Sequence, residues 1–385
     1  MTTSAKPPGG LLSCLTGTLA RSRVASPAQC PTIGVLPGDG IGPEVIAAAL
    51  RVLAAVEETI GARFEIVRGG AIGEEAERAG DKPLPDSVTA FCADIFARGG
   101  TILNGPGGGR YVYDLRRRFD LFCKFVPVRP WPSLFRAGKM NPQALENVDL
   151  LIVRDNIGGV YQGSWDTRLT PQGRRAEHSF SYDEASVYRL VEVAARAAAR
   201  RRNRLHVIVK EGGIPAISAL WREVGLAVAR KYGVNAAVMN VDLAAYELIQ
   251  HPDAFDVVAA PNLIGDILAD ISGVLLASRG LTFSGNYSPR GEAVYQTNHG
   301  CAHDLAGTDT ANPAGQILSL SMLLRESFGM ERAAALMETG LAEAWRAGWR
   351  TADIAEPGCR IVGTSAMAEC VVDRILSGTE APQAA

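Results

Sequence analysis

The stretch that decides the fold is TIGVLPGDGIGPE, residues 32–44. A short run of aliphatic and β-branched residues precedes a glycine-rich turn, and Pro43 then opens a segment with helical character that continues through Glu57. The turn matches only part of the glycine pattern of a dinucleotide-binding loop, because Val45 stands where that pattern has its last glycine. The stretch therefore predicts a strand, a tight turn and a helix.

Further strands are expected at residues 63–68 and 100–104, with helical segments between them. Strands that alternate with helices are typical of α/β proteins with a largely parallel sheet. A chain of 385 residues exceeds the size of one ordinary core, so two lobes are expected. The turn-rich stretch 131–142 is a candidate boundary between them.

The composition excludes several classes of protein. Lys and Arg (39) nearly balance Asp and Glu (41), so no net field attracts nucleic acid or an anionic membrane. Seven cysteines without a CxxC pair indicate neither a disulfide framework nor a zinc site, which fits the cytoplasm. No run approaches the roughly 20 apolar residues that a membrane span needs.

The first 38 residues contain no acidic residue. We expect residues 1–31 to form a disordered leader, with a targeting peptide as the alternative.

The segment PNLIGDILAD, residues 261–270, carries two acids on one predicted helix face. Asp266 and Asp270 lie four residues apart, with apolar residues between them. A solvated acidic face is the plain interpretation of this spacing. The alternative is a site for Mg²⁺ or Mn²⁺, because these hard cations prefer carboxylate oxygens and would relieve the repulsion between the two acids.

Three other segments carry candidate polar groups. The stretch RYVYDLRRRFDLFCKFVPVRP, residues 110–130, is either a solvated helix face or a wall that binds anions. Tyr161 lies in a glycine turn, and Lys210 ends a predicted strand before another glycine turn, where active sites of α/β folds tend to lie.

Residues 314–327 have the pattern of an amphipathic helix.

Seven motifs occur in the order found in one enzyme family: LPGDGIGPEV, LRRRFDLF, VRDNIGGVYQG, the strand ending in Lys210, NVDLAAYELI, NLIGDILAD and HGCAHDLAGTDTANP. Over residues 32–375 the chain resembles the metal-dependent β-decarboxylating 2-hydroxyacid dehydrogenases, which include isocitrate, isopropylmalate, homoisocitrate and tartrate dehydrogenases. The resemblance implies an isopropylmalate-dehydrogenase-like α/β fold with a large twisted mixed sheet flanked by helices, not a standard Rossmann domain.

The resemblance also implies two domains. Residues 32–121 together with 278–378 would bind the nucleotide, and residues 122–277 would form the dimerisation, metal and substrate domain. In such a homodimer the active sites are shared, because Lys210 and Asp242 reach the site of the partner subunit.

Roles for individual residues follow from the same resemblance. Catalysis would involve Tyr161 and Lys210, and Mg²⁺ or Mn²⁺ would be held by Asp242, Asp266 and Asp270. The expected substrate-binding residues are Arg116 and Arg154, with Arg110, Tyr113 and Lys124 in an atypical pocket, and the expected cofactor-binding residues are His299, Gly300, Ala302, Asp304 and Asn312. Asp304 followed by Leu305 resembles the NAD type, since a carboxylate accepts from the ribose hydroxyl and repels a 2′-phosphate.

The chain departs from the family pattern at the substrate pocket. Val126 stands where the family has a second carboxylate-binding arginine, and Lys124 or Arg129 could replace it from a shifted position. Gly109, Val112 and Tyr113 differ from the isopropylmalate pocket, and Arg110 and Val112 differ from the isocitrate pocket. The predicted reaction is therefore NAD-dependent oxidative decarboxylation of a 3-substituted malate. The alternatives are a regulatory subunit without activity, a tartrate-type dehydrogenase, and a phosphonate-bearing malate as substrate.

Overall fold

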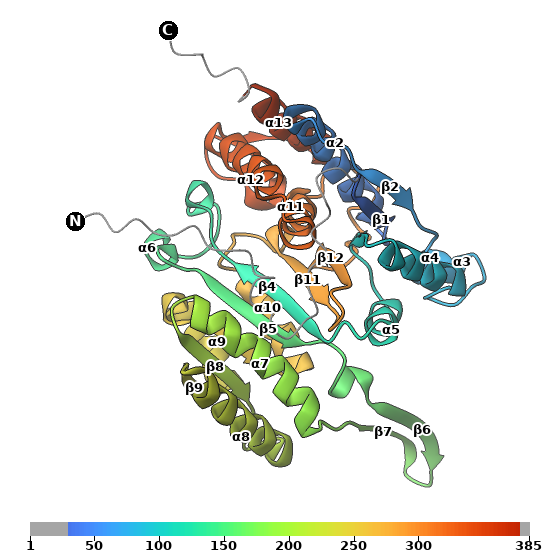
Figure 1. Ribbon diagram of the computed structural model, residues 1–385, viewed down its shortest axis with the longest axis vertical. Coiled ribbons are helices and arrows are strands. Elements are labelled where there is room, and N and C mark those ends of the chain that lie inside the picture. The colour runs from blue at the N-terminus through green and yellow to red at the C-terminus, as the bar shows by residue number, and fades with distance from the viewer. Residues whose placement is uncertain (1–29, 378–385) are drawn as a thin grey trace.

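The structure is a computed structural model that describes residues 30–377, so the predicted leader lies almost wholly outside the described residues (Figure 1). One ten-stranded sheet runs through the molecule in the order β2-β1-β3-β12-β11-β4-β5-β10-β8-β9. Its strands are β1 (Thr32–Leu36), β2 (Glu65–Arg68), β3 (Thr101–Asn104), β4 (Cys123–Val128), β5 (Leu150–Asp155), β8 (Arg204–Val209), β9 (Asn235–Asn240), β10 (Val257–Ala260), β11 (Phe283–Tyr287) and β12 (Ala293–Thr297).

The sheet is mixed, and its antiparallel part lies in the middle. The pairings β12–β11, β11–β4 and β4–β5 are antiparallel, and the remaining neighbours are parallel. The fold class predicted from the sequence, a large mixed sheet flanked by helices, is confirmed. The alternation of strands and helices predicted the parallel parts, because parallel neighbours need crossover helices.

Helices flank the sheet along its length (Figure 1). Helices α2, α11, α12 and α13 pack together near one end, and α7 packs on α8 near the other. The helices are α2 (Gly42–Ile60), α3 (Gly73–Arg78), α4 (Asp86–Ala97), α5 (Tyr111–Arg118), α6 (Pro142–Leu145), α7 (Glu184–Arg200), α8 (Pro215–Tyr232), α9 (Val241–Gln250), α10 (Asn262–Ser272), α11 (Ala314–Phe328), α12 (Glu331–Arg346) and α13 (Thr364–Ser377). Short 3₁₀ turns are η1 (Pro132–Leu134), η2 (Val160–Gln162), η3 (Pro252–Ala254), η4 (Arg279–Leu281) and η5 (Ala352–Ile354).

The glycine-rich turn after β1 packs against two other loops. Gly38 and Gly40 have positive φ, and a Cβ at either position would lie within 2.2 Å of a carbonyl oxygen, that of Pro106 or of Cys301. The neighbouring amides donate to the same two carbonyls, Asp39 to Pro106 and Ile41 to Cys301, each at 2.9 Å. These amides are therefore used within the protein, and the turn is a packing turn rather than a phosphate cradle.

Helix α11 is not amphipathic, and the prediction for residues 314–327 was wrong on this point. The helix packs against β11 and β12 and against α2 and α12, so no face is left to solvent. Its polar residues are buried with partners: Ser319 donates to the Gly315 carbonyl at 2.8 Å, and Gln316 to the Asn104 carbonyl at 3.3 Å. The sequence pattern misleads because these polar side chains look solvent-facing until the second layer of helices is placed.

The predicted domain boundaries coincide with a division of the sheet. Strands from residues 32–121 and 278–378 occupy one half, those from 122–277 the other, and the halves join where β11 pairs with β4. The two-domain assignment itself stays a prediction.

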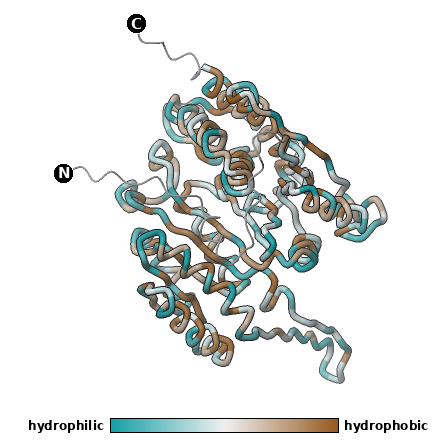
Figure 2. The backbone as a smooth tube through the Cα atoms, viewed as in Figure 1, coloured by the Kyte–Doolittle hydropathy of each residue, from teal (hydrophilic) through white to brown (hydrophobic). Residues whose placement is uncertain are grey.

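A two-stranded hairpin projects from the body of the molecule (Figure 1). It consists of β6 (Ser164–Thr170) and β7 (Gly173–Ser179), and a second small sheet pairs β13 (Trp349–Arg350) with β14 (Arg360–Ile361). Brown, apolar segments follow the central strands, whereas the hairpin is mostly pale or teal, which shows that the core lies around the sheet (Figure 2). Within residues 30–377, no helix combines the length and the apolar character that crossing a bilayer requires.

Candidate active site

The two acids of PNLIGDILAD lie one turn apart on helix α10. Asp266 and Asp270 are partly buried, with 34% and 44% of their side chains exposed. Burial raises the pKa of Asp270, and the neighbouring Asp266 adds to the rise, while Arg279 opposes it through an ion pair of 2.9 Å. Burial also disfavours ionised Asp266, but the nearby cations Arg154 and Lys124 outweigh it and lower the pKa. The two acids are therefore only partly solvated, and each has a cationic partner within the chain.

Asp266 contacts two of the other predicted site residues. The guanidinium of Arg154, from the end of β5, forms an ion pair with it, and the Tyr161 hydroxyl donates to Asp266 Oδ2 at 2.8 Å. Asn262 holds Arg154 in place, accepting from its Nη2 at 2.8 Å and its Nε at 3.3 Å. Asn262 was missed from the sequence, where it read as part of the turn that opens the helix.

Tyr161 is held by the turn that carries it. Gly159 enters η2 with φ 68, and Asn262 donates to the Gly158 carbonyl at 2.8 Å. Burial, with the charge of Asp266 next to it, raises the pKa of Tyr161 above its ordinary value. The phenol therefore stays protonated at neutral pH, as an acid that donates a proton must.

Arg110 connects α5 to this turn. Its Nη1 donates to the Tyr161 carbonyl at 3.0 Å, and its guanidinium lies 5.1 Å from the Tyr113 ring and 4.9 Å from the Trp165 ring. Asp114 is 3.6 Å away as an ion-pair partner. The guanidinium of Arg110, which was predicted to bind substrate, thus already contacts several groups of the protein. Trp165 comes from the projecting hairpin, and nothing in its local sequence indicated this contact.

Tyr113 packs its ring 5.1 Å from that of Tyr161, and its role in substrate binding stays a prediction. Behind it are two buried cations, Arg116 (5% exposed) and Lys124 (2%). Arg116 Nε has no hydrogen-bond partner, and burial together with repulsion from Arg154 lowers the pKa of Arg116. Arg154, Arg116 and Lys124 thus form a buried cation cluster beside Asp266.

Lys210 and Asp242 lie elsewhere. Lys210 Nζ is 3.1 Å from Asp242 Oδ1, and their side chains are 43% and 68% exposed. Among the described residues, this pair forms no hydrogen bond or ion pair with Asp266 or Asp270. Exposed apolar side chains lie on the neighbouring helices α9 and α10: Leu243, Tyr246, Leu263 and Ile267, between 38% and 60% exposed.

The donor set suits a hard divalent cation. Within residues 30–377, no three acidic, histidine or cysteine side chains gather closely enough to hold a metal ion. Asp266 and Asp270 supply hard carboxylate oxygens from one helix face, whose repulsion a cation would relieve. Within the described residues, one chain thus supplies two carboxylates that could hold such a cation.

The expected nucleotide-binding residues lie in the loop between β12 and α11. His299 Nε2 and both amide atoms of Asn298 are buried without hydrogen-bond partners, and Asp304 is exposed without an ion pair among the described residues. Unpaired buried polar atoms fit a polar ligand such as the nucleotide. A Cβ added at Gly300 would meet no atom within 4 Å, and Ala302 has a positive φ of 42.

Two protein groups shape this loop. The Asn312 side chain is already engaged, since it accepts from the Ala314 amide at 3.0 Å and donates to Asp353 at 3.1 Å. Glu44, at the start of α2, accepts from the amides of Gly307 and Asp309 and ties the loop down. The sequence did not single out Glu44, because its partners are more than 260 residues away.

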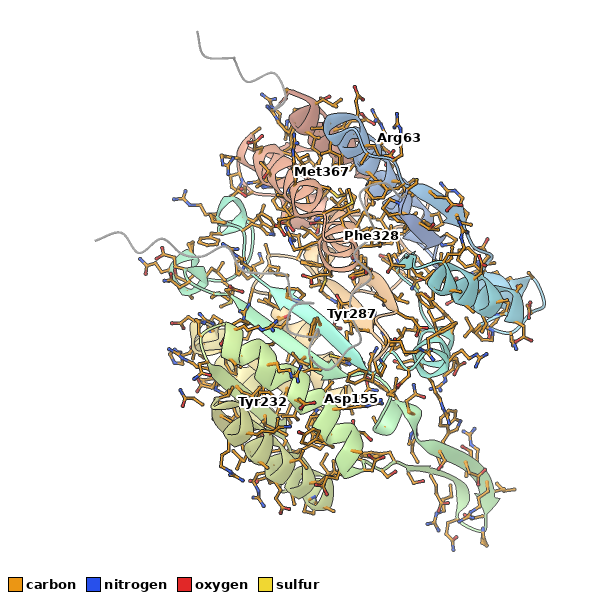
Figure 3. All side chains as sticks on the ribbon, in the orientation of Figure 1. Arg63, Asp155, Tyr232, Tyr287, Phe328 and Met367 are labelled. Carbon is orange, nitrogen blue, oxygen red and sulfur yellow. The ribbon has the colours of Figure 1, made fainter. Side chains whose placement is uncertain are left out.

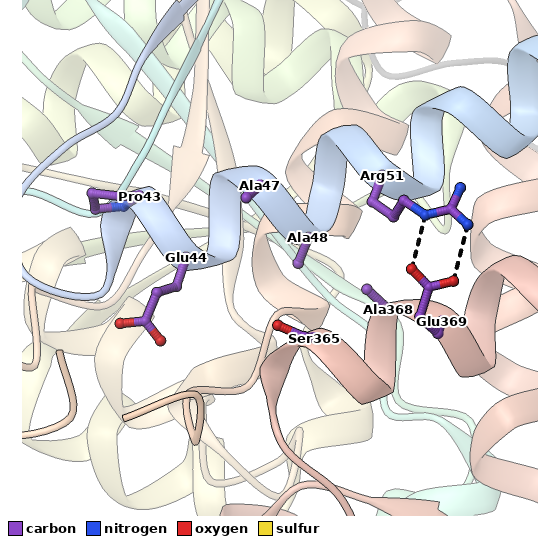
Figure 4. A pocket seen from close by; sticks show the side chains of 8 residues that line it. All are labelled: Pro43, Glu44, Ala47, Ala48, Arg51, Ser365, Ala368 and Glu369. Carbon is purple, nitrogen blue, oxygen red and sulfur yellow. Dashed lines mark hydrogen bonds and ion pairs between the residues drawn. The ribbon is translucent and has the colours of Figure 1, made fainter. Parts of the chain in front are cut away.

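Figure 3 labels Asp155 and Tyr287 in the middle of the molecule. Asp155 directly follows Arg154 at the end of β5, and Tyr287 ends β11, which is separated from β5 by β4. A separate surface hollow of about 480 Å³ lies between α2 and α13, and the ion pair of Arg51 with Glu369 (2.8 Å) closes one side of it (Figure 4). It contains none of the predicted site residues.

Comparison with known proteins agrees with this architecture. The family model described as isocitrate/isopropylmalate dehydrogenase matches residues 32–371. A 3-isopropylmalate dehydrogenase of Burkholderia pseudomallei is 35% identical over 359 residues, 88% of this chain and 99% of that protein, and one of Aquifex aeolicus is 33% identical over 362 residues, 90% and 97%. The crystal structure of isocitrate dehydrogenase from Methylococcus capsulatus superposes with TM-score 0.80 at 28% identity, covering 90% of this chain and 99% of that one.

The fold and the site define a mixed-sheet α/β dehydrogenase. The chain belongs to the isocitrate/isopropylmalate dehydrogenase family. Membership places it among the dehydrogenases that oxidatively decarboxylate a hydroxy acid, which generally use NAD and a divalent metal ion.

Proposed function

We propose that the protein catalyses the NAD-dependent oxidative decarboxylation of a 3-substituted malate. The observation that carries the proposal is the pair of contacts on Asp266, which joins a metal-binding carboxylate to a substrate arginine, Arg154, and to a protonated phenol, Tyr161. Such a constellation can bind an anionic hydroxy acid and protonate it at one place.

Each side chain has a defined task in this reaction. Arg116 and Arg154 bind substrate carboxylates, because both guanidinium groups are buried next to Asp266. Lys210 accepts the proton of the C2 hydroxyl, directly or through water, and Tyr161 returns a proton to C3 after carbon dioxide departs. When bound, Mg²⁺ or Mn²⁺ at the aspartates would polarise the C2 oxygen, and the nicotinamide would accept the hydride.

The active form is proposed to be a homodimer with shared sites. Among the described residues, Lys210 and Asp242 are exposed and form no hydrogen bond or ion pair with Asp266, which fits their presentation to the site by a second chain. The exposed apolar residues on α9 and α10 support this, because such a patch on a soluble domain marks an interaction surface. With C₂ symmetry, each chain would present its Lys210 and Asp242 to the Asp266 site of the other chain. Residues 122–277 would provide it, and the cytoplasm stays the predicted location.

The nucleotide is proposed to be NAD, bound by His299, Gly300, Ala302 and Asp304 with residues 32–121 and 278–378. The exposed Asp304 carboxylate can accept from a ribose hydroxyl and would repel a 2′-phosphate. Replacing Asp304 by Lys and Leu305 by Tyr should shift the ratio of kcat/KM values toward NADP. An unchanged ratio would mean that another residue reads the ribose.

The deciding experiment is NADH formation with Mn²⁺ over a panel of substrates. The panel holds isopropylmalate, isocitrate, homoisocitrate, tartrate and a phosphonate-bearing malate, with carbon dioxide measured in parallel. We expect turnover with a 3-substituted malate and release of carbon dioxide. NADH without carbon dioxide would support a tartrate-type dehydrogenase, and a dimer that binds NAD and Mn²⁺ but turns over none of the panel would support a regulatory subunit.

A further inference from the structure

Lys124 carries a buried amino group that no described acid pairs. It lies in β4, across from Arg154 on β5 and Asn286 on β11. Only 2% of its surface is exposed. Within residues 30–377, its amino group takes part in no ion pair or side-chain hydrogen bond. A buried, unpaired ammonium is costly, so a functional reason for keeping it is required.

The neighbours of Lys124 increase this cost. Arg116 is also buried and has an unpartnered Nε, and Arg154 is the only member of the cation cluster that an acid pairs. Burial first, and then repulsion from Arg116 and Arg154, lower the pKa of Lys124 well below its ordinary value, while Asp266 and Asp270 oppose this. The cluster therefore lacks negative charge, and a bound anion would supply it.

The strand register shows how Lys124 relates to the missing arginine. Side chains two residues apart in a strand point to the same face, so Lys124 and Val126 share one face of β4. Val126 pairs with Ile152 and is fully buried, about 7 Å farther along the strand from the Arg154 end than Lys124. A lysine at position 124 therefore starts closer to Asp266 and needs less reach. Arg129, the other candidate replacement, is exposed beyond the end of β4.

We propose that Lys124 is a specificity-determining residue that binds a second carboxylate of the substrate. The inference rests on the proposed function and assigns within it the cation that holds the second carboxylate: Lys124, which like Arg116 is buried and has no acid partner among the described residues. An ammonium is a compact charge with three rotatable donors and cannot form the bidentate fork of a guanidinium. The second carboxylate is therefore held by charge, close to β4.

A binding experiment without NAD or metal tests this directly. Melting temperatures of wild type, Lys124→Met and the control Lys139→Met are measured with malate and with lactate, which lacks the second carboxylate. Lys139 is exposed and has no ion pair among the described residues, so it is a matched lysine outside the cluster. Wild type should bind malate at least tenfold more tightly than lactate. In Lys124→Met this preference should fall below threefold, and in Lys139→Met it should persist.

Stability of the ligand-free protein is the second readout. Lys124→Met removes a buried unpaired charge and keeps the side-chain volume, so its melting temperature should rise by several degrees, whereas a structural lysine would lower it. Lys124→Arg, which keeps the charge, should retain a preference for malate. Full preference for malate in Lys124→Met, or a lower melting temperature of that variant without ligand, would overturn the proposal.

The outcome is separable from that of the proposed reaction. If Lys124 controls malate binding but no member of the substrate panel is oxidised, the binding inference stands and the dehydrogenase proposal fails. If a 3-substituted malate is turned over equally well by wild type and Lys124→Met, the reaction stands and the role of Lys124 is refuted.

Discussion

The region around Asp266 and the region around Lys210 differ in how complete they are. Asp266 is partly buried and already contacts Arg154 and Tyr161, so its surroundings are fixed within one chain. Lys210 pairs only with Asp242 on an exposed surface, next to apolar side chains on α9 and α10. One chain thus holds one group of candidate site residues together and displays the other on its surface, as the proposed shared site of a homodimer requires.

The largest expected effect comes from substituting one carboxylate in each region, on separate chains. Asp266→Asn and Asp242→Asn should each lower kcat by about a thousandfold or more, because both remove a carboxylate from the proposed metal site. Mixing the two variants after subunit exchange should restore about a quarter of wild-type activity, since half of the dimers are hybrids and each hybrid has one intact site. Steady-state NADH formation with the substrate found in the panel measures this.

A mixture that stays inactive, although native mass spectrometry shows hybrid dimers, would contradict the shared site. Each variant mixed with itself is the control.

A smaller effect is expected for the two proton-transfer residues. Tyr161→Phe and Lys210→Met should each lower kcat by about a hundredfold with little change in KM, because positioned acids and bases typically contribute this much. Only Tyr161→Phe removes a hydrogen bond to Asp266, so only this variant should alter Mn²⁺ affinity of a separated chain. Calorimetric Mn²⁺ titration checks this. Equal Mn²⁺ affinities in both variants would remove the distinction between the two regions.

Arg110 tests whether the Tyr161 turn must be held from α5. Arg110→Gln breaks the bond to the Tyr161 carbonyl and the stack between Tyr113 and Trp165, so kcat should fall about tenfold through misplacement, with KM less affected. Arg117→Gln on the exposed side of α5 is the control. Recovery in Arg110→Lys would indicate that charge suffices. A rise in KM alone would assign Arg110 to substrate binding.

The smallest expected effect is a pH dependence of stability at the cation cluster. The folded state lowers the pKa of Lys124, so above that value the unfolded chain binds a proton that the folded chain has lost. Stability of wild type should therefore rise with pH toward the ordinary lysine value of about 10.4. Melting curves of wild type and Lys124→Met between pH 7 and 9.5 should converge as pH rises. A constant difference would show that Lys124 stays protonated in the folded state over this pH range.

Much of the fold could be predicted from the sequence, because the patterns that indicate its strands and helices are local. The stretch 32–44 predicted a strand, a turn and a helix, and β1 and α2 follow it, with α2 continuing past Glu57 to Ile60, where Gly61 in a left-handed conformation ends it. Helix α11 was misjudged because its burial depends on helices and strands distant in the chain. The hairpin β6–β7 was not predicted, since its residues are mostly exposed and lack a core-facing alternation.

For the site, the sequence by itself determined which residue types are present and their spacing: Asp266 and Asp270 on one helix face, and a valine at position 126. Only the tertiary structure decided which of them meet. It brought Arg154 and Tyr161 to Asp266, occupied Arg110 with protein groups, and left Lys124 buried without an acid. The physical reason is that contacts and burial depend on strand order and register in a ten-stranded sheet, which join segments more than 100 residues apart.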